Sequence, residues 1–331
     1  MSVALFCPCG TSDPAVDSDI IGGVVLRRDH PRPLGLALGQ HVTDLTSVIE
    51  EFGYGVDSDL SIRELLEGWQ EFGPVVESAL RRLTTRDSEK VRWEPISLCD
   101  LGAPVHPEAS LIFTAANYAA HTSEAESSEK VTNKVSTGSD TPYVFLKPMR
   151  SVIGPYDQVV KPKDVEQLDW EVELAVVIGS PGRRIPVGEA MDHIAGYIIC
   201  NDVSARDFVQ RPDWPMFSSD WFAQKAFDTF TPIGPAFVPA GLVDDPRDLV
   251  LQLSVDGEIM QEAHARDMIF SIAEQISYAS RFTSLQPGDM ISTGTPSGVG
   301  MARGRYLDVG EVMTAQVSGL GKQQNRIVQE L

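Results

Sequence analysis

The amino-acid sequence predicts an α+β fold in which strands dominate. Runs rich in β-branched and aromatic residues recur between Gly, Pro and Asp turns, over residues 109–118, 141–148, 169–179, 194–202, 231–239, 249–257 and 312–319. Helical 3–4 spacing of apolar residues is clear over residues 60–83 and 268–282. Because these helices do not alternate with the strands, a parallel βαβ sheet is not expected.

The first hundred residues predict a small α/β domain of their own. Residues 20–50 contain three strand-like segments, IIGGVVL, LGLALG and HVTDLTSVI, and the helix of residues 60–83 follows them. The text DLGAPVHPEA at residues 100–109 is typical of a connector. We therefore expect a small N-terminal domain over residues 1–105 and a larger domain over residues 106–331.

The chain is strongly acidic, since 27 Lys and Arg stand against 47 Asp and Glu in 331 residues, a formal charge of −20. A pI near 4.6 argues against nucleic acid or an anionic membrane as a partner, because both are bound through clustered basic residues. The N-terminus lacks a basic region, and no stretch reaches the ~20 apolar residues of a membrane span. The four cysteines form no CxxC pair, so we expect a reduced, cytoplasmic protein.

The segment DWEVELAVVIG carries an acidic strand end. Strand alternation puts Asp169, Glu171 and Glu173 on one face and apolar residues on the other. Carboxylates ~6.6 Å apart repel by roughly 2–3 kcal/mol at an effective dielectric constant of ~20. A hard divalent cation would offset that repulsion. The alternative is a strand end that frays into solvent and is neutralised by Lys161, Lys163 or neighbouring arginines.

Two further charged residues lie at the ends of apolar strand-like segments. Asp202, in NDVSARD, is either the third carboxylate of an octahedral Mg²⁺ or Mn²⁺ site or the N-cap of a helix that begins near Ser204. Lys225, in QKAFDTFTPIGP, enters an apolar, Pro-closed strand. It is either an edge lysine or a cation held for a substrate anion.

His121 and Glu124 are three residues apart, so on a helical turn they share a face. A carboxylate that orients an imidazole suits a general base, and a chance surface pair is the alternative. The polar stretch 121–141 is either a surface excursion or a lid over a pocket. The small residues of STGTPSGVG, 292–300, form either a tight turn or an amide cradle for an anion.

These motifs, in this order, resemble the fumarylacetoacetate hydrolase family from about residue 108 to about residue 318. The signatures are NYxxHxxE, DWEVELAVVIG, GYIICNDVSARD, KAFDTFTPIGP and STGTPSGVG. The resemblance implies a mixed β-roll or β-sandwich catalytic domain after the small N-terminal α/β domain, a homodimer, a small keto-acid substrate and one Mg²⁺ or Mn²⁺ per site. It places the metal ligands at Glu171, Glu173 and Asp202 and the catalytic residues at His121, Glu124 and Lys225. Implied substrate-binding residues are Arg206, Gly294, Thr295, Tyr118 and Gln210.

The sequence departs from the family pattern at two places. One extra residue precedes Gln210, which puts its usual substrate contact in doubt, and the aromatic segment RPDWPMFSSDWF follows. That segment shapes either an acyl pocket or an interface. Thr114 stands where the fumarylacetoacetate-cleaving enzyme has a fourth acidic ligand, which points to the acylpyruvate hydrolase-like branch.

The resemblance implies hydrolytic cleavage of a C–C bond in an acylpyruvate or related β-diketo acid. In that hypothesis His121, oriented by Glu124, deprotonates the attacking water, and Lys225 stabilises the oxyanion. Decarboxylation of an oxaloacetate-type acid, tautomerisation, or isomerisation or hydration of a dienoic acid would use the same metal-stabilised enolate. A catalytically silent scaffold protein is the alternative outside enzymes.

Overall fold

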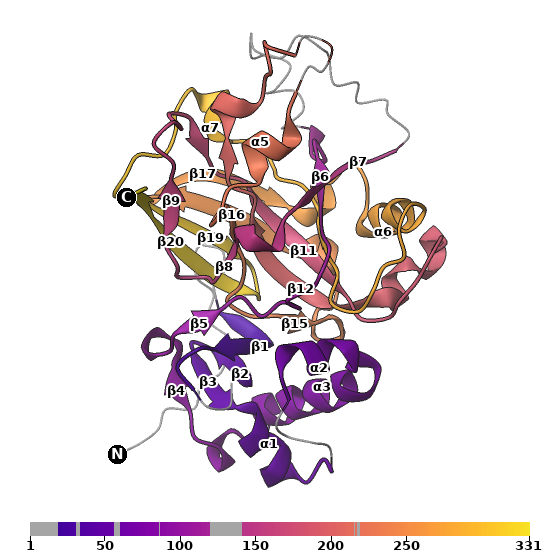
Figure 1. Ribbon diagram of the computed structural model, residues 1–331. Coiled ribbons are helices and arrows are strands. Elements are labelled where there is room, and N and C mark those ends of the chain that lie inside the picture. The colour runs from indigo at the N-terminus through magenta and orange to yellow at the C-terminus, as the bar shows by residue number, and fades with distance from the viewer. Residues whose placement is uncertain are drawn as a thin grey trace.

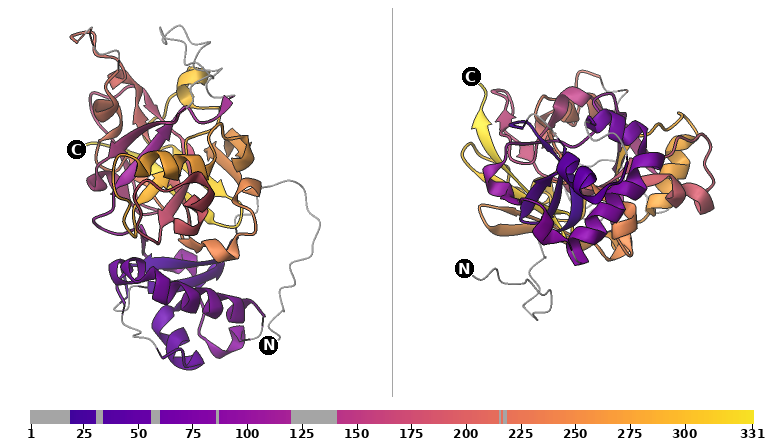
Figure 2. Two further views of the ribbon diagram at one scale, coloured as in Figure 1. Left: turned by 90° about the vertical axis from the view of Figure 1, so that its right-hand side faces the viewer. Right: turned by 90° about the horizontal axis from the view of Figure 1, so that it is seen from below.

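The computed structural model of the protein describes residues 19–30, 34–55, 60–85, 87–119, 141–214, 216 and 219–331. Figure 1 shows a smaller part, formed by the start of the chain, stacked against a larger strand-rich part. The two further views of Figure 2 show the same stack from another side and from below.

The smaller part is an antiparallel five-stranded sheet with three helices. The strands lie in the order β4-β3-β2-β1-β5. The elements are β1 (Ile20–Arg27), β2 (Leu34–Gly39), β3 (His41–Asp44), α1 (Leu45–Phe52), α2 (Ile62–Glu67), α3 (Trp69–Thr85), β4 (Glu94–Pro95) and β5 (Leu101–Gly102).

Two sequence expectations for this part are wrong in detail. The third strand-like segment ends early, because Asp44 accepts a hydrogen bond from the Ser47 amide and caps α1. The helix expected over residues 60–83 is two helices, which meet at Gly68. A capping box between Ser61 and Glu64 begins the first of them.

The larger part contains two main sheets. A six-stranded sheet has the order β15-β12-β11-β18-β6-β7, and a five-stranded sheet has the order β17-β16-β19-β20-β9. Pairs β18–β6 and β20–β9 are parallel and the other neighbours are antiparallel, so both sheets are mixed. The strands are β6 (Leu111–Ala115), β7 (Tyr143–Lys147), β9 (Val159–Lys161), β11 (Val172–Ile178), β12 (Ile194–Asn201), β15 (Val238–Pro239), β16 (Val250–Val255), β17 (Glu258–His264), β18 (Met290–Ser292), β19 (Val312–Val317) and β20 (Gly321–Gln329).

Smaller elements complete the larger part. Two short strand pairs are β10 (Leu168–Asp169) with β13 (Ser204–Ala205), and β8 (Val152–Ile153) with β14 (Thr231–Pro232). The helices are α5 (Trp221–Lys225), α6 (Ile272–Ser280) and α7 (Gly300–Arg303). Helix α6 confirms the helix predicted around residues 268–282.

Strand β11 is buried on both faces. Val172 and Leu174 belong to the same core cluster as Leu253 of β16, so this face packs toward the five-stranded sheet. Ala175 belongs to a second core cluster with Trp69 of α3. The smaller part therefore covers the outer face of the six-stranded sheet, which explains why the strand is apolar on both faces beyond its acidic start.

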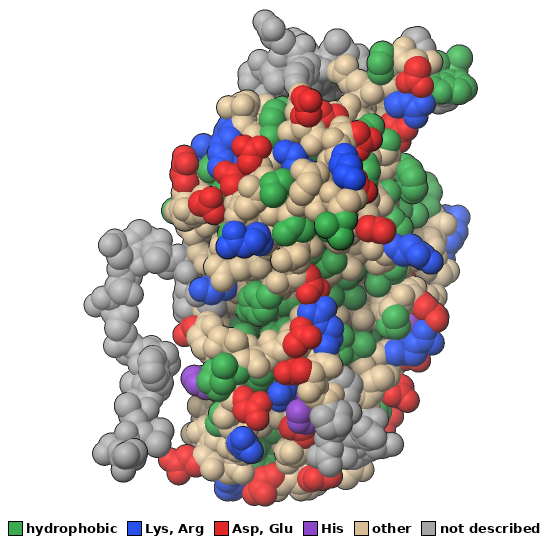
Figure 3. All heavy atoms as spheres, turned by 60° about the vertical axis from the view of Figure 1, so that its left-hand side comes forward, with side chains coloured by type: hydrophobic (Ala, Val, Ile, Leu, Met, Phe, Trp, Pro, Cys, Tyr) green, Lys and Arg blue, Asp and Glu red, His purple; other side chains and the backbone are tan. Residues whose placement is uncertain are grey.

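Charged side chains of both signs are interspersed on the face shown in Figure 3. The acidic excess of the sequence therefore does not collect into one patch on that face. None of the described helices combines the length and the apolar character needed to span a bilayer.

Candidate metal centre

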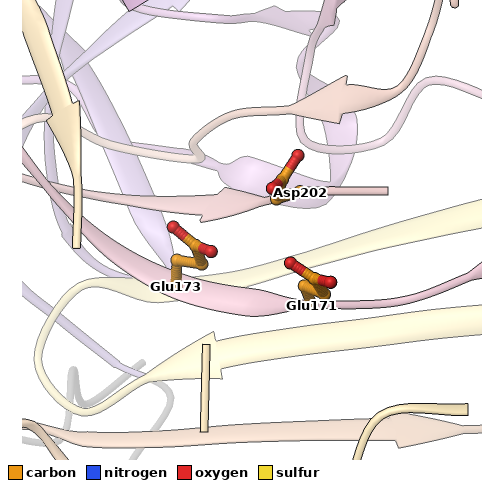
Figure 4. Close-up of side chains that lie close together, drawn as sticks. All are labelled: Glu171, Glu173 and Asp202. Atoms are coloured by element: carbon orange, nitrogen blue, oxygen red, sulfur yellow. The ribbon is translucent and has the colours of Figure 1, made fainter. Parts of the chain in front are cut away.

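Three buried carboxyl groups converge where β11 begins and β12 ends (Figure 4). One oxygen each of Glu171, Glu173 and Asp202 lies within 4.8 Å of the other two. The exposed fractions of these residues are 6%, 1% and 1%. The structure thus brings together the three residues that the sequence predicted as metal ligands, and we call them the triad.

Strand pairing explains why these side chains meet. Strands β11 and β12 are antiparallel neighbours with Val172 opposite Asn201. Glu171 and Glu173 are two residues apart and point to the same side. The amide of Asp202 donates to the carbonyl of Glu171 at 2.9 Å, so the third carboxyl group enters beside the first.

Two buried lysines lie against the triad. Nζ of Lys225, at the end of α5, donates to Oε2 of Glu171 at 2.9 Å and to Oδ2 of Asp202 at 2.5 Å. Nζ of Lys147, at the end of β7, donates to Oδ1 of Asp202 at 2.7 Å and to two backbone carbonyls. The sequence interpretation missed Lys147, although it too ends an apolar run before a proline.

Burial and charge act in opposite directions on these two ammonium groups. Burial would lower the pKa of Lys225, but the carboxylates of Asp202 and Glu171 outweigh it and hold the pKa above its ordinary value. Burial dominates at Lys147 and lowers its pKa, although Asp202 opposes the change. Lys225 therefore stays charged beside the triad.

The guanidinium of Arg206 joins the triad to a fourth acidic residue. Its Nε donates to Oδ2 of Asp169 at 2.8 Å, and its Nη2 donates to Oε1 of Glu171. Asp169 is fully buried and also accepts from the amides of Gly300 and Met301 at 2.6 and 3.0 Å. Asp169, expected on one face with the two glutamates, thus holds Arg206 and the start of α7. The substrate-binding role of Arg206 stays a prediction.

The small-residue segment 292–300 packs against Glu173. Oγ of Ser292 donates to Oε2 of Glu173, and the amide of Gly294 donates to the same oxygen at 3.1 Å. Oγ1 of Thr295 donates to a carbonyl of β11 at 3.0 Å and accepts from Nε2 of Gln261 at 2.8 Å. These contacts fix the segment beside the triad, and substrate binding by Gly294 and Thr295 stays a prediction.

The remaining predicted residues lie in different environments. Tyr118 is buried, and that burial, followed by the charge of Glu173, raises the pKa of its phenol. Gln210 is exposed. His121 and Glu124, with nearly all of the polar stretch 121–141, lie outside the described residues.

Two alternatives from the sequence are wrong, and a third is wrong in part. Lys225 ends a helix rather than entering a strand, because Asp220 caps α5 by accepting from an amide. Asp202 caps no helix, since strand β13 begins at Ser204. The acidic strand end is buried rather than frayed, and the ammonium groups of Lys161 and Lys163 donate to carbonyls of Leu307 and Leu331 instead. Neutralisation by an arginine neighbour is confirmed, since Arg206 pairs with Asp169 and Glu171.

The charges around the triad fit a divalent cation. Four buried carboxyl groups face three cations: Asp169, Glu171, Glu173 and Asp202 face Lys147, Arg206 and Lys225. Within the described part of the chain, no lysine or arginine forms an ion pair with Glu173. Burial raises the pKa of that carboxyl well above its ordinary value, and the neighbouring Asp202 and Glu171 add to the effect. A hard cation with oxygen ligands would complete such a set.

A family profile described as the C-terminal part of fumarylacetoacetate (FAA) hydrolase matches residues 110–328, the span that contains the triad. The chain belongs to the fumarylacetoacetate hydrolase family. This membership confirms the predicted fold class and an FAH-type catalytic domain preceded by a small N-terminal domain.

Relatives within the fumarylacetoacetate hydrolase family carry different names. Human oxaloacetate tautomerase FAHD2B, mitochondrial, is 34% identical over 272 residues, which cover 82% of each chain. A probable 2-hydroxyhepta-2,4-diene-1,7-dioate isomerase from Mycobacterium abscessus matches 94% of this chain and 99% of its own, with a TM-score of 0.72 and 28% identity. Maleylpyruvate hydrolase from Sphingobium sp. SYK-6, in complex with manganese(II) and pyruvate, matches 93% and 100%, with a TM-score of 0.70 and 27% identity. These relatives support a metal-dependent enzyme acting on keto acids without selecting the acylpyruvate hydrolase-like branch.

Metal binding is expected to weaken as the pH falls. If Glu173 is a ligand as predicted, it would bind a cation only as the carboxylate, and its raised pKa means that a proton must leave first. Below that pKa, the affinity for Mn²⁺ should fall by about tenfold for each unit of pH, with about one proton released per cation. Calorimetric titration in two buffers of different ionisation enthalpy measures both quantities. A pH-independent affinity without proton release would contradict the expectation.

Proposed function

We propose that the protein is a divalent-metal-dependent enzyme that interconverts the keto and enol forms of a small 2-oxo acid of the oxaloacetate type. The observation that carries this proposal is the convergence of three buried carboxyl groups with the ammonium of Lys225. The similarity to human oxaloacetate tautomerase FAHD2B supports the substrate class.

In this proposal Glu171, Glu173 and Asp202 hold Mg²⁺ or Mn²⁺. The bound cation would supply Lewis acidity at the keto oxygen of the substrate. Lys225 contributes a buried positive charge that stabilises negative charge on the same oxygen. His121, oriented by Glu124, is the proposed general acid and base that moves the proton to and from the substrate carbon.

Hydrolysis of an acylpyruvate is the second candidate. It is favoured by the His121-x-x-Glu124 spacing, which suits activation of a water molecule, and by the named maleylpyruvate hydrolase relative. Both candidates need an enolate to be stabilised beside the triad. They differ in one step, since tautomerisation moves a proton and breaks no C–C bond.

Proton NMR of two substrates with added Mg²⁺, which is diamagnetic, separates the candidates. With oxaloacetate, we expect the enol and keto signals to equilibrate at least about 100-fold faster than with Mg²⁺ alone, without loss of CO₂. Release of acetate and pyruvate from acetylpyruvate would instead favour hydrolysis, and release of CO₂ from oxaloacetate would favour decarboxylation. If neither substrate is turned over faster than with Mg²⁺ alone, the proposal is wrong.

Three further expectations stay proposals. The homodimer follows from the family resemblance, and light scattering after gel filtration tests it. The division at residue 105 is tested by expressing residues 106–331 alone. The cytoplasmic location is tested by fractionation.

A further inference from the structure

The two lysines at the triad differ in the partners that they hold. The three donors of the Lys147 ammonium meet Oδ1 of Asp202 at 2.7 Å, the carbonyl of Phe230 at 2.8 Å and the carbonyl of Val203 at 3.3 Å. Two of these partners belong to the backbone and cannot leave. Lys147 is therefore a fixed counter-ion.

Lys225 instead holds carboxylate oxygens that face the triad. Its short contacts are to Oε2 of Glu171 at 2.9 Å and to Oδ2 of Asp202 at 2.5 Å, and its one backbone partner, the carbonyl of Asp202, lies at 3.5 Å. The other oxygen of each carboxylate is held from outside, by Arg206 on Glu171 and by Lys147 on Asp202. The two oxygens that accept from Lys225 are therefore the ones that neither Arg206 nor Lys147 holds.

We infer that the ammonium of Lys225 is an internal counter-ion of the metal-free site, which a divalent cation must displace from Glu171 and Asp202. The inference rests on the proposed metal site and deepens it. Two positive groups at the same oxygens repel strongly in a buried site, where water screens little. Metal binding would then release the ammonium of Lys225, which could interact with a substrate anion. The metal ion and the free ammonium would therefore become available at the same time.

Binding of Mn²⁺ to matched variants tests this inference without any activity assay. The free aqueous Mn²⁺ signal in electron paramagnetic resonance gives the dissociation constant for the wild type, Lys225→Met and Lys147→Met. We expect Lys225→Met to bind Mn²⁺ at least about tenfold more tightly than the wild type, because no ammonium has to be displaced. Lys147→Met removes a buried ammonium from the other oxygen of the same carboxylate and is expected to raise the affinity by a clearly smaller factor than Lys225→Met, because that ammonium does not have to be displaced.

Two other variants keep the test decisive. Lys225→Arg retains a cation that can hold the same oxygens, so its affinity should stay near that of the wild type. Lys225→Met is purified with Mn²⁺ and then dialysed to remove the metal. If this variant does not stay folded after dialysis, Lys225→Gln takes its place. An unchanged or weaker affinity in Lys225→Met, or an equal gain in Lys147→Met, would overturn the inference. Absence of Mn²⁺ binding by the wild type would instead overturn the proposed metal site.

Discussion

Replacing Glu173 by glutamine is expected to abolish tight Mn²⁺ binding and to lower turnover by about three orders of magnitude. The triad would keep two carboxylates, and an amide oxygen is a weaker ligand than a carboxylate for a hard cation. Glutamine also imitates the protonated carboxyl group that burial favours at this position. Mn²⁺ titration and substrate turnover at saturating Mn²⁺ measure the two effects.

The fold is expected to tolerate Glu173→Gln. The amide carbonyl can still accept from the Ser292 hydroxyl and the Gly294 amide, and the new side chain has nearly the same volume. The melting temperature of the metal-free protein should therefore match that of the wild type, while the increase on adding Mn²⁺ disappears. Glu258→Gln, at an exposed site on β17, is the matched control and should change neither quantity. Wild-type Mn²⁺ affinity in Glu173→Gln would show that the triad is not the cation site.

Much of the candidate site could be predicted from the local pattern of the sequence. Period-two alternation puts Glu171 and Glu173 on one side of a strand, which needs no knowledge of the fold. Asp202 lies close to the two glutamates because β11 pairs with β12. The sequence alone did not predict that pairing, and only the family resemblance placed Asp202 among the ligands. Lys147 was missed because it precedes Asp202 by 55 residues and reaches it from the edge strand β7.

One strand that escaped prediction has polar side chains on its buried face. Strand β20 reads GKQQNRIVQ, yet Gln323 and Asn325 are buried. The side-chain amide nitrogen of Asn325 donates to carbonyls at Gly154, Pro155 and Asp157, so hydrogen bonds hold this polar residue in the interior. A hydrophobic period cannot reveal such a strand. Helix α1 was missed for another reason. It is short, and its start depends on one capping residue, Asp44, within a segment that otherwise has the composition of a strand.

Replacing Asp169 by alanine is expected to destabilise the protein by about 3–5 kcal/mol. The carboxylate is fully buried and accepts four hydrogen bonds, from Arg206 and from the amides of Trp170, Gly300 and Met301. Without it, the buried guanidinium loses one of its two carboxylate partners and the amides lose their acceptor. The shift of the urea unfolding midpoint, at unchanged slope, measures the loss.

Two comparisons separate the buried network from a simple loss of charge. Asp248 pairs with Arg266 at the surface, so Asp248→Ala should cost no more than about 1 kcal/mol. Gly300→Ala should also destabilise the protein, because an added Cβ would lie 2.7 Å from Oδ1 of Asp169 and would clash with the carbonyl of Arg305. If Asp169→Ala costs no more than Asp248→Ala, the network does not stabilise the fold as argued. In Asp169→Ala, Arg206 keeps only Glu171 as a carboxylate partner. The guanidinium would then compete with a cation for Glu171, so we expect this variant to bind Mn²⁺ more weakly than the wild type.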